Sequence, residues 1–328
     1  MTSCPPYRPF RGAEPPHFVE RADDDGLGDA VITRCALSAY RRGPADPRFH
    51  RLVVSRPGLG KTALLRAVAR LATSELGWAV AFHRCHQKER ALGRLAGEVL
   101  DAGRRHWAVP GAGSRRPVLA GEPSALPVAG GRAPWAPGAA GAWEREPVLV
   151  TPGPVPSFVP PGAELPWSAL RGSVRLVGQL ARQHGSGLLV GLDDVDLLSA
   201  GEAECLGHMA RSVSRDGLPV AFLMSSGEEL GARFARRGNF WGTLWTARLA
   251  LFDDEEAREA LVVPAAERGV DFEEGALEMA CAAAQGSPLE VQRLGFAAWS
   301  SACQSHVVAA TDVEAALGSL APDLAPTA

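Results

Sequence analysis

Residues 55–62 form a glycine-rich stretch whose spacing is typical of a phosphate-binding loop. They read Ser-Arg-Pro-Gly-Leu-Gly-Lys-Thr and match the pattern G-x-x-x-x-G-K-[ST] at every fixed position except the first. Glycines let backbone N–H groups close around phosphate oxygens, and the helix that follows adds the positive end of its dipole. The stretch therefore predicts a site for a nucleoside triphosphate, most simply ATP with Mg²⁺.

The side chains of this loop have distinct expected roles. Lys61 is expected to reach the β- and γ-phosphates, and the hydroxyl of Thr62 to ligate Mg²⁺. Ser55 replaces the usual first glycine, and such a small residue is the replacement least expected to abolish binding. The alternative is a plain glycine-rich turn before a helix. The predicted loop contacts to the nucleotide are Ser55, Pro57, Gly58, Leu59, Gly60, Lys61, Thr62 and Ala63.

Two acidic residues, Asp193 and Asp194, follow the apolar run 188–192. An apolar strand that ends in paired acids has the form of a second nucleotide motif, because ligands of open α/β sheets sit at the carboxyl ends of strands. Asp193 is expected to hold the metal, directly or through water, and Asp194 to orient or activate the attacking water. A helix cap or a turn is the alternative for acids in this position.

Further polar candidates follow the next apolar run, 219–224. A hydroxyl of Ser225 or Ser226 would be placed to contact the γ-phosphate or the attacking water, although a strand-to-helix turn explains this pair equally well. Three arginines lie on a predicted helix beyond them. They form either a solvated basic face or the source of an arginine finger across a subunit interface: Arg233, Arg236 and Arg237.

The elements that must position these residues alternate between short apolar strands and amphipathic helices. This alternation predicts an α/β fold with a five-stranded parallel sheet covered by helices on both faces. The expected strands are 51–54, 78–82, 188–192, 219–224 and 247–251. The expected helices of this part are 26–42, 62–76, 88–102, 167–184 and 200–215. After residue 252 the pattern contains only helices, which predicts a small all-helical lid.

The same pattern divides the chain into segments. We expect an extended arm over 1–16, an ATPase core over 17–251, a helical lid over 252–320 and a flexible tail over 321–328. Within the core, residues 104–166 are dominated by Gly, Pro and Ala and show no periodicity. Such a segment buries too little apolar surface to offset its ordering entropy, so we expect a disordered insertion.

The composition excludes several classes of protein. A net charge of -3 and a pI near 6.3 argue against a chain that binds nucleic acid along its whole length. No signal peptide and no apolar span long enough for a bilayer are visible, and six scattered cysteines suit free thiols, so we expect a cytoplasmic protein without membrane contact. His83, Cys85 and His86 lie close together, but a strand end explains them better than a metal site.

These motifs, in this order, resemble the AAA+ ATPases, particularly the branch of origin-recognition-like ATPases and related bacterial signalling ATPases. Phe18-Val19-Glu20-Arg21 looks like the N-terminal segment near the adenine, which implies a nucleotide contact from Val19. Residues 251–257 resemble the family's entry into its helical lid. Gly286-Ser287-Pro288 resembles the lid motif that approaches the nucleotide, which implies a contact from Pro288.

Two departures from the family pattern bear on function. Leu289 stands where a lid arginine is often found, and Arg293, one turn further on, is a candidate substitute. The chain also ends about where the lid should end, without the winged-helix domain that often binds DNA. The leading hypothesis is an Mg²⁺-dependent ATPase that uses ATP hydrolysis to switch conformation and act on a protein partner or in a homo-oligomer. A non-hydrolysing ATP switch, a DNA-associated ATPase and, remotely, a small-molecule kinase remain alternatives.

Overall fold

The structure, a computed structural model, describes residues 5–9, 15, 17–21, 32–86, 91–107, 164–228, 241, 244–302 and 305–320. The chain divides into two compact units, each assembled from separate stretches of sequence. The first unit contains residues 1–31, 55–66 and 248–328, and the second contains residues 32–54 and 67–247. The phosphate-binding loop therefore belongs to the same unit as the C-terminal helices.

The second unit is built on a five-stranded sheet in the order β2-β3-β4-β1-β5. β3 pairs in parallel with β2 and with β4, and β1 pairs in parallel with β4. Every residue of β3 and β4 is buried, as expected for apolar strands covered on both faces. The strands are β1 (Arg51–Val54), β2 (Ala79–Arg84), β3 (Leu188–Asp193), β4 (Val220–Ser226) and β5 (Trp245–Arg248). This confirms the predicted α/β class and the parallel sheet.

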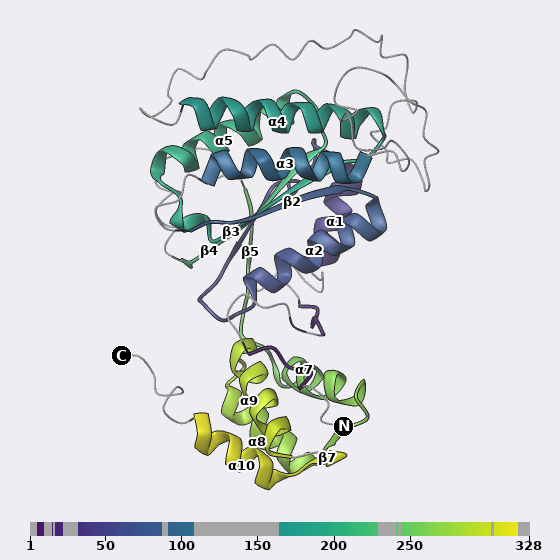
Figure 1. Cartoon of the computed structure of the whole chain (residues 1–328), viewed down its shortest axis with the longest axis vertical. Helices are drawn as coiled ribbons and strands as arrows, with labels where there is room; N and C mark the ends of the chain where they lie inside the picture. The colour runs from purple at the N-terminus through teal and green to yellow at the C-terminus, as the bar shows by residue number, and fades with distance from the viewer. Residues whose placement is uncertain are drawn as a thin grey trace. The chain divides into compact units, whose positions relative to one another are not determined.

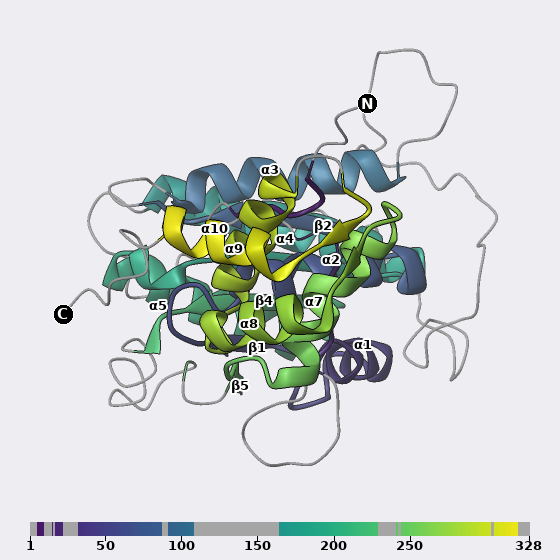
Figure 2. The same ribbon diagram turned by 90° about the horizontal axis from the view of Figure 1, so that it is seen from below.

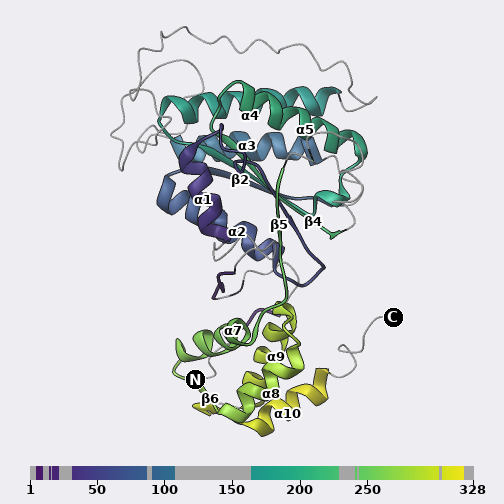
Figure 3. The same ribbon diagram turned by 180° about the vertical axis from the view of Figure 1, so that it is seen from behind.

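Helices cover both faces of this sheet. Figures 1 and 3 show α3 (Ala91–Trp107), α4 (Glu164–Gln183) and α5 (Ala200–Arg215) on one face. α1 (Ile32–Arg42) and α2 (Lys61–Leu76) lie on the opposite face, and Figure 2 shows α1 and α3 on opposite sides of the strands. α5 begins with a capping box in which Ser199 and Glu202 satisfy each other's backbone N–H groups.

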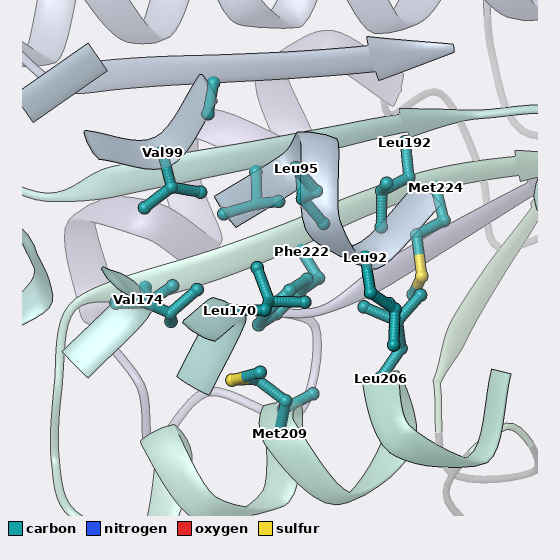
Figure 4. Close-up of a cluster of buried hydrophobic side chains, with 14 of the residues drawn as sticks. Leu92, Leu95, Val99, Leu170, Val174, Leu192, Leu206, Met209, Phe222 and Met224 are labelled. Carbon is teal, nitrogen blue, oxygen red and sulfur yellow. The ribbon is translucent and has the colours of Figure 1, made fainter. Parts of the chain in front are cut away.

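The core of this unit fills the space between the sheet and the α3, α4 and α5 layer. Leucine, valine and methionine side chains from these helices interlock with the inner face of β3 and β4 (Figure 4). The labelled residues are Leu92, Leu95, Val99, Leu170, Val174, Leu192, Leu206, Met209, Phe222 and Met224. Because interiors of this kind are close-packed, the strand ends that carry polar residues are held on a rigid base.

Gly191, in the middle of β3, leaves no room for a side chain. A Cβ there would lie 2.7 Å from Cδ2 of Phe82, its partner on β2. We expect Gly191→Ala to lower the free energy of unfolding by about 1–3 kcal/mol, because Phe82 or the strand must move. Urea unfolding measures this. Gly172→Ala on α4 is the matched control, since nothing lies within 4 Å of its Cβ position; equal losses in both variants would contradict the prediction.

The C-terminal part of the first unit is a bundle of short helices, in which Figure 3 shows α9 beside α8 and α10. Asp253 and Glu256 form a capping box at the start of α7, and the acidic side chains of its first turn lie at the positive end of the helix dipole. The helices are α7 (Asp254–Ala266), α8 (Glu274–Ala284), α9 (Pro288–Ser301) and α10 (Ala310–Leu320). A hydrophobic core joins them, and Leu261, Val291 and Leu294 are fully buried in it.

The bundle also contains a short parallel pair of strands, β6 (Asp271–Phe272) and β7 (Val307–Val308). This pair corrects the expectation that only helices follow residue 252, because strands of two residues are too short to produce a periodic pattern. The last strand of the large sheet is also shifted. β5 ends at Arg248, whereas the expected strand extended to Leu251, whose side chain is 55% exposed.

Segments near the expected insertion and the expected arm differ in detail from the sequence analysis. α3 continues to Trp107 and α4 begins at Glu164, and the residues between them lie outside the described part of the chain. In the N-terminal arm, Tyr7 is buried in the core of the helical bundle. Its hydroxyl donates to the carbonyl of Leu261 at 2.7 Å, and its ring packs against Gly295 and Trp299.

Among the described residues, no helix has both the length and the apolar character to cross a bilayer.

Candidate nucleotide-binding site

The loop between β1 and α2 has the backbone geometry of an anion-binding turn. Gly58 and Gly60 both adopt positive φ angles, 89° and 87°, which glycine accepts without strain. Such alternation turns successive peptide groups so that N–H donors can converge on an anion. α2 begins at Lys61, so the positive end of the helix opens on the same loop.

The side chain of Lys61 lies along this loop and is largely buried. Its ammonium donates to the carbonyls of Ser55 at 2.8 Å and Arg56 at 3.1 Å. These bonds hold the cation beside the loop. Thr62 follows at the start of α2 and is half-buried.

Ser55 is accommodated without backbone strain. Its φ is not positive, since the only described non-glycine residues with positive φ are Asp194 and Gln285. The residue is buried, and its hydroxyl donates to the carbonyl of Arg56 at 3.0 Å. The first position of this loop therefore does not demand glycine, and its carbonyl still accepts the bond from Lys61.

The start of α9 meets the loop within the same unit. Ser287 caps the helix, Pro288 is its first residue, and a Cβ on Gly58 would lie 3.5 Å from Cβ of Leu289. An apolar side chain thus packs against the loop where an arginine was expected from the resemblance. Arg293, the candidate substitute, donates to Glu290 at 3.0 Å.

The paired acids lie at the carboxyl end of β3 in the second unit. Asp193 is fully buried, and its carboxylate accepts a bond of 2.5 Å from the hydroxyl of Ser225, on β4. The same hydroxyl accepts the backbone N–H of Asp194 at 2.9 Å. Ser225 is itself fully buried, so its hydroxyl is committed to the two acidic residues. Ser226, also buried, donates to the carbonyl of Gly227.

Asp194 differs from Asp193 in conformation and surroundings. Its backbone is left-handed, with φ 58° and ψ 50°, at the start of the 3₁₀ turn η1 (Val195–Leu197), a conformation that Asp and Asn tolerate best among residues with a side chain. Its carboxylate lies 3.2 Å from Nε of Arg84. Burial and the neighbouring Asp193 raise the pKa of Asp194, and Arg84 opposes this rise.

Two arginines near these motifs were not singled out by the sequence. Arg84 ends β2, and its register partner across the sheet is Asp193, so the strand pairing alone brings it to the acids. Arg21 contacts the phosphate-binding loop, donating to the carbonyl of Leu59 at 2.7 Å. The only sequence signal for Arg21 was its place in the segment 18–21.

The remaining predicted residues are distributed as follows. The side chain of Val19 is buried in the core of the helical bundle. His83 is paired with Glu98 at 3.0 Å, and no cluster of three or more potential His, Cys, Asp or Glu ligands occurs in the described ranges. Three residues lie outside the part of the chain that the structure describes: Arg233, Arg236 and Arg237.

The sequence has no match among protein-family models or curated proteins. Solved structures do match. A single-substitution variant of Thermotoga maritima RuvB has a TM-score of 0.50 at 14% identity, over 93% of this chain and 74% of that chain. Pyrobaculum aerophilum Cdc6p has a TM-score of 0.50 at 13% identity, over 87% and 64%. Aeropyrum pernix ORC1, solved in complex with DNA, has a TM-score of 0.50 at 16% identity, over 92% and 68%.

The chain shares its fold with these three structures, which are AAA+ ATPases. This shared fold agrees with the resemblance drawn from the two motifs, and it confirms the expected sheet followed by a helical domain. Identities of 13–16% carry the fold and no more. The chemistry of this chain must therefore be argued from its own residues.

Proposed function

We propose that this chain binds ATP with Mg²⁺ through residues 55–62 and hydrolyses it to ADP and phosphate, driving a conformational switch that acts on a partner. The observation that carries the proposal is the loop itself. Two glycines with positive φ, a buried lysine bonded to the loop carbonyls and a helix that begins at this lysine together form a phosphate cradle.

The residues present fit both ATP and Mg²⁺. Hydroxyl and carboxylate oxygens are the ligands that Mg²⁺ prefers, and Thr62 and Asp193 supply them. β1 ends at Val54, one residue before the loop, and its register partner on β4 is Ser226. β3 and β4 carry Asp193 and Ser225 at the same end of the sheet. The order of the two motifs in the chain, a glycine-rich loop followed by paired acids after a buried strand, supports the proposal that both serve one nucleotide.

Each residue then has a defined task. Lys61 binds the β- and γ-phosphates and stabilises the charge that develops on them, and the loop N–H groups orient the phosphate chain. When bound, Mg²⁺ supplies further neutralisation of phosphate charge. Asp194 accepts a proton from the attacking water, or orients this water for in-line attack. Ser225 positions both acids, a narrower role than the direct contact with phosphate or water expected from its place in the sequence.

The pH dependence of turnover tests the role of Asp194. A protonated carboxyl cannot accept a proton, so phosphate release should fall as pH drops through the pKa of Asp194, which is raised above the ordinary aspartate value. Arg84→Met removes the charge that lowers this pKa, so the acid limb should move to higher pH. Rates measured from neutral pH down to the lowest pH at which the chain stays folded provide the test, with Arg94→Met as the control. An unmoved acid limb would argue against Asp194 as the titrating group.

The function as a whole is tested by titrating the purified chain with a fluorescent ATP analogue and then measuring phosphate release. Saturable, Mg²⁺-dependent binding with steady release supports the ATPase. Failure of the folded chain to bind at millimolar ATP would refute nucleotide binding altogether.

A second candidate, a non-hydrolysing ATP switch, is favoured by specific observations. Leu289 packs against Gly58 at the start of the lid, and Arg293 is engaged by Glu290. No arginine that follows Ser287 is therefore placed to sense the γ-phosphate in the described helix α9. Tight ATP binding without phosphate release would establish this candidate.

The partner is a protein or further copies of this chain, with an arginine finger drawn from Arg233, Arg236 and Arg237. A DNA-associated role is less favoured, because the net charge is -3. Four cysteines of the described ranges are free thiols, which fits a reducing, cytoplasmic setting.

A further inference from the structure

Arg21 is a buried arginine whose side chain contacts both the phosphate-binding loop and the entry to the helical bundle. Nη2 donates to the carbonyl of Leu59 at 2.7 Å, and Nη1 donates to the carbonyl of Ala250 at 3.2 Å. The guanidinium also lies over the ring of Phe252, 4.9 Å from its centroid. One side chain thus joins three separate stretches of the first unit.

The burial of this cation requires such contacts. Arg21 is 8% exposed, and burial lowers its pKa to about 10, while Glu256 raises it. The guanidinium therefore remains charged at neutral pH, and its desolvation is offset by carbonyl acceptors and the aromatic ring. A planar guanidinium can serve two acceptors in fixed directions, which the single ammonium of lysine cannot reproduce.

The bond to Leu59 bears directly on the shape of the phosphate cradle. Leu59 lies between Gly58 and Gly60, the two residues with positive φ, so its peptide groups have the most freedom to rotate. Nη2 of Arg21 lies 3.0 Å from the position of a Cβ on Gly60. Because the Leu59 carbonyl is bound to this cation, it is restrained from turning toward an anion held by the loop N–H groups.

The other end of the contact lies at the start of the bundle. Ala250 and Phe252 precede α7, and the N–H of Phe252 donates to the carbonyl of Gly286 at 2.7 Å. Gly286 has a φ of 72°, and a Cβ there would meet the Phe252 carbonyl at 2.5 Å. Gly286 leads into Ser287, the N-cap of α9. A change at Leu59 can therefore reach the start of α9 through Arg21, Phe252 and Gly286.

We propose that Arg21 is a positioning residue that holds the phosphate-binding loop ready for the nucleotide and transmits nucleotide binding to the 250–252 and 286–289 segments of the bundle. This inference rests on the nucleotide site proposed above. It assigns to Arg21 the link between the loop and the bundle, and it does not require Arg21 to touch the nucleotide.

Nucleotide affinity provides the first test, using a fluorescent ATP analogue with Mg²⁺. Losing a bond from a charged donor at the loop should weaken binding by about 10- to 100-fold in Arg21→Met. Arg21→Lys keeps the charge but not the two directed bonds, so we expect intermediate affinity. The control is Arg258→Met, which removes a half-buried arginine of the same unit paired with Glu274 at 2.7 Å, and should bind like the unaltered chain.

Hydrogen exchange provides a readout that a merely structural role would not move. In the unaltered chain, nucleotide should slow exchange of the Phe252 amide and of the amides from Gly286 to Leu289. In Arg21→Lys, saturating nucleotide should still protect the loop amides but leave the bundle amides unchanged. Phe252→Leu keeps both hydrogen bonds and removes the ring, so it should retain part of the response. Variants are compared only where circular dichroism shows native helicity.

The outcomes separate the inference from the function on which it rests. If the unaltered chain binds nucleotide and the folded Arg21 variants match it in affinity and in protection of the bundle, the role of Arg21 is overturned and the nucleotide site stands. If Arg21→Met unfolds, the folded Arg21→Lys and Phe252→Leu variants decide by the same criteria. Absence of nucleotide binding by the unaltered chain overturns both.

Discussion

Lys61→Ala is expected to weaken ATP binding by about 100-fold, or roughly 3 kcal/mol. The ammonium is the one cation of the loop that is both largely buried and bonded to the loop carbonyls of Ser55 and Arg56. Alanine removes the charge expected to meet the phosphates and leaves these carbonyls without their donor. We therefore expect weaker ATP binding and a changed loop conformation. Titration with a fluorescent ATP analogue measures the effect.

Arg70→Ala is the matched control for this prediction. Arg70 lies on the same helix, α2, and is exposed, so its loss removes a positive charge from the helix without touching the loop. We expect its ATP affinity to stay within about 2-fold of the unaltered chain, since exposed charges are largely screened. Equal affinities of the Lys61→Ala and Arg70→Ala variants would show that residues 55–62 do not form the nucleotide site.

Asp194→Asn is expected to slow phosphate release by about 100- to 1000-fold, the usual contribution of a positioned general base. Asparagine keeps the size of the side chain and tolerates the left-handed backbone found at this position, so the fold should survive. ATP affinity should change little, because the lost charge acts on the attacking water and not on the bound phosphates. Single-turnover phosphate release and ATP titration on the same sample measure the two quantities.

Asp196→Asn is the control, since Asp196 lies two residues further on and is exposed. The Asp196 carboxylate accepts a long hydrogen bond of 3.3 Å from the Gly227 amide. Phosphate release by this variant should therefore remain near the original rate. If Asp194→Asn and Asp196→Asn release phosphate equally fast, Asp194 is not the base. If all chains bind ATP and none releases phosphate, the non-hydrolysing switch is the function.

The predictions from the sequence agree best with the structure where a motif consists of neighbouring residues. The loop 55–62 and the start of α2 at Lys61 depend on residues within a few positions of one another. Their steric and hydrogen-bonding requirements are therefore written into adjacent residues. The apolar runs of β3 and β4 were equally clear, because strands buried on both faces need continuous hydrophobicity.

The sequence was less informative where solvent exposure or long-range packing decides the end of an element or the burial of a side chain. The apolar stretch 247–251 suggested a strand up to Leu251, but β5 stops at Arg248 and the Leu251 side chain is exposed. Tyr7 stands in a proline-rich segment without periodicity, yet it is buried in the bundle core against Gly295, nearly three hundred residues away in the chain. No local pattern specifies such a contact.

The conformation of the loop 55–62, the place of the acidic pair at a strand end and the alternation of strands and helices were determined by the sequence alone, because each rests on the chemistry of neighbouring residues. The tertiary structure decided how these groups are held. It committed the Ser225 hydroxyl to Asp193 and Asp194, brought Arg84 to Asp194 through strand pairing, and set Arg21 and Leu289 against the loop. These contacts join residues far apart in the chain, and only the packing of whole elements brings their side chains within bonding distance.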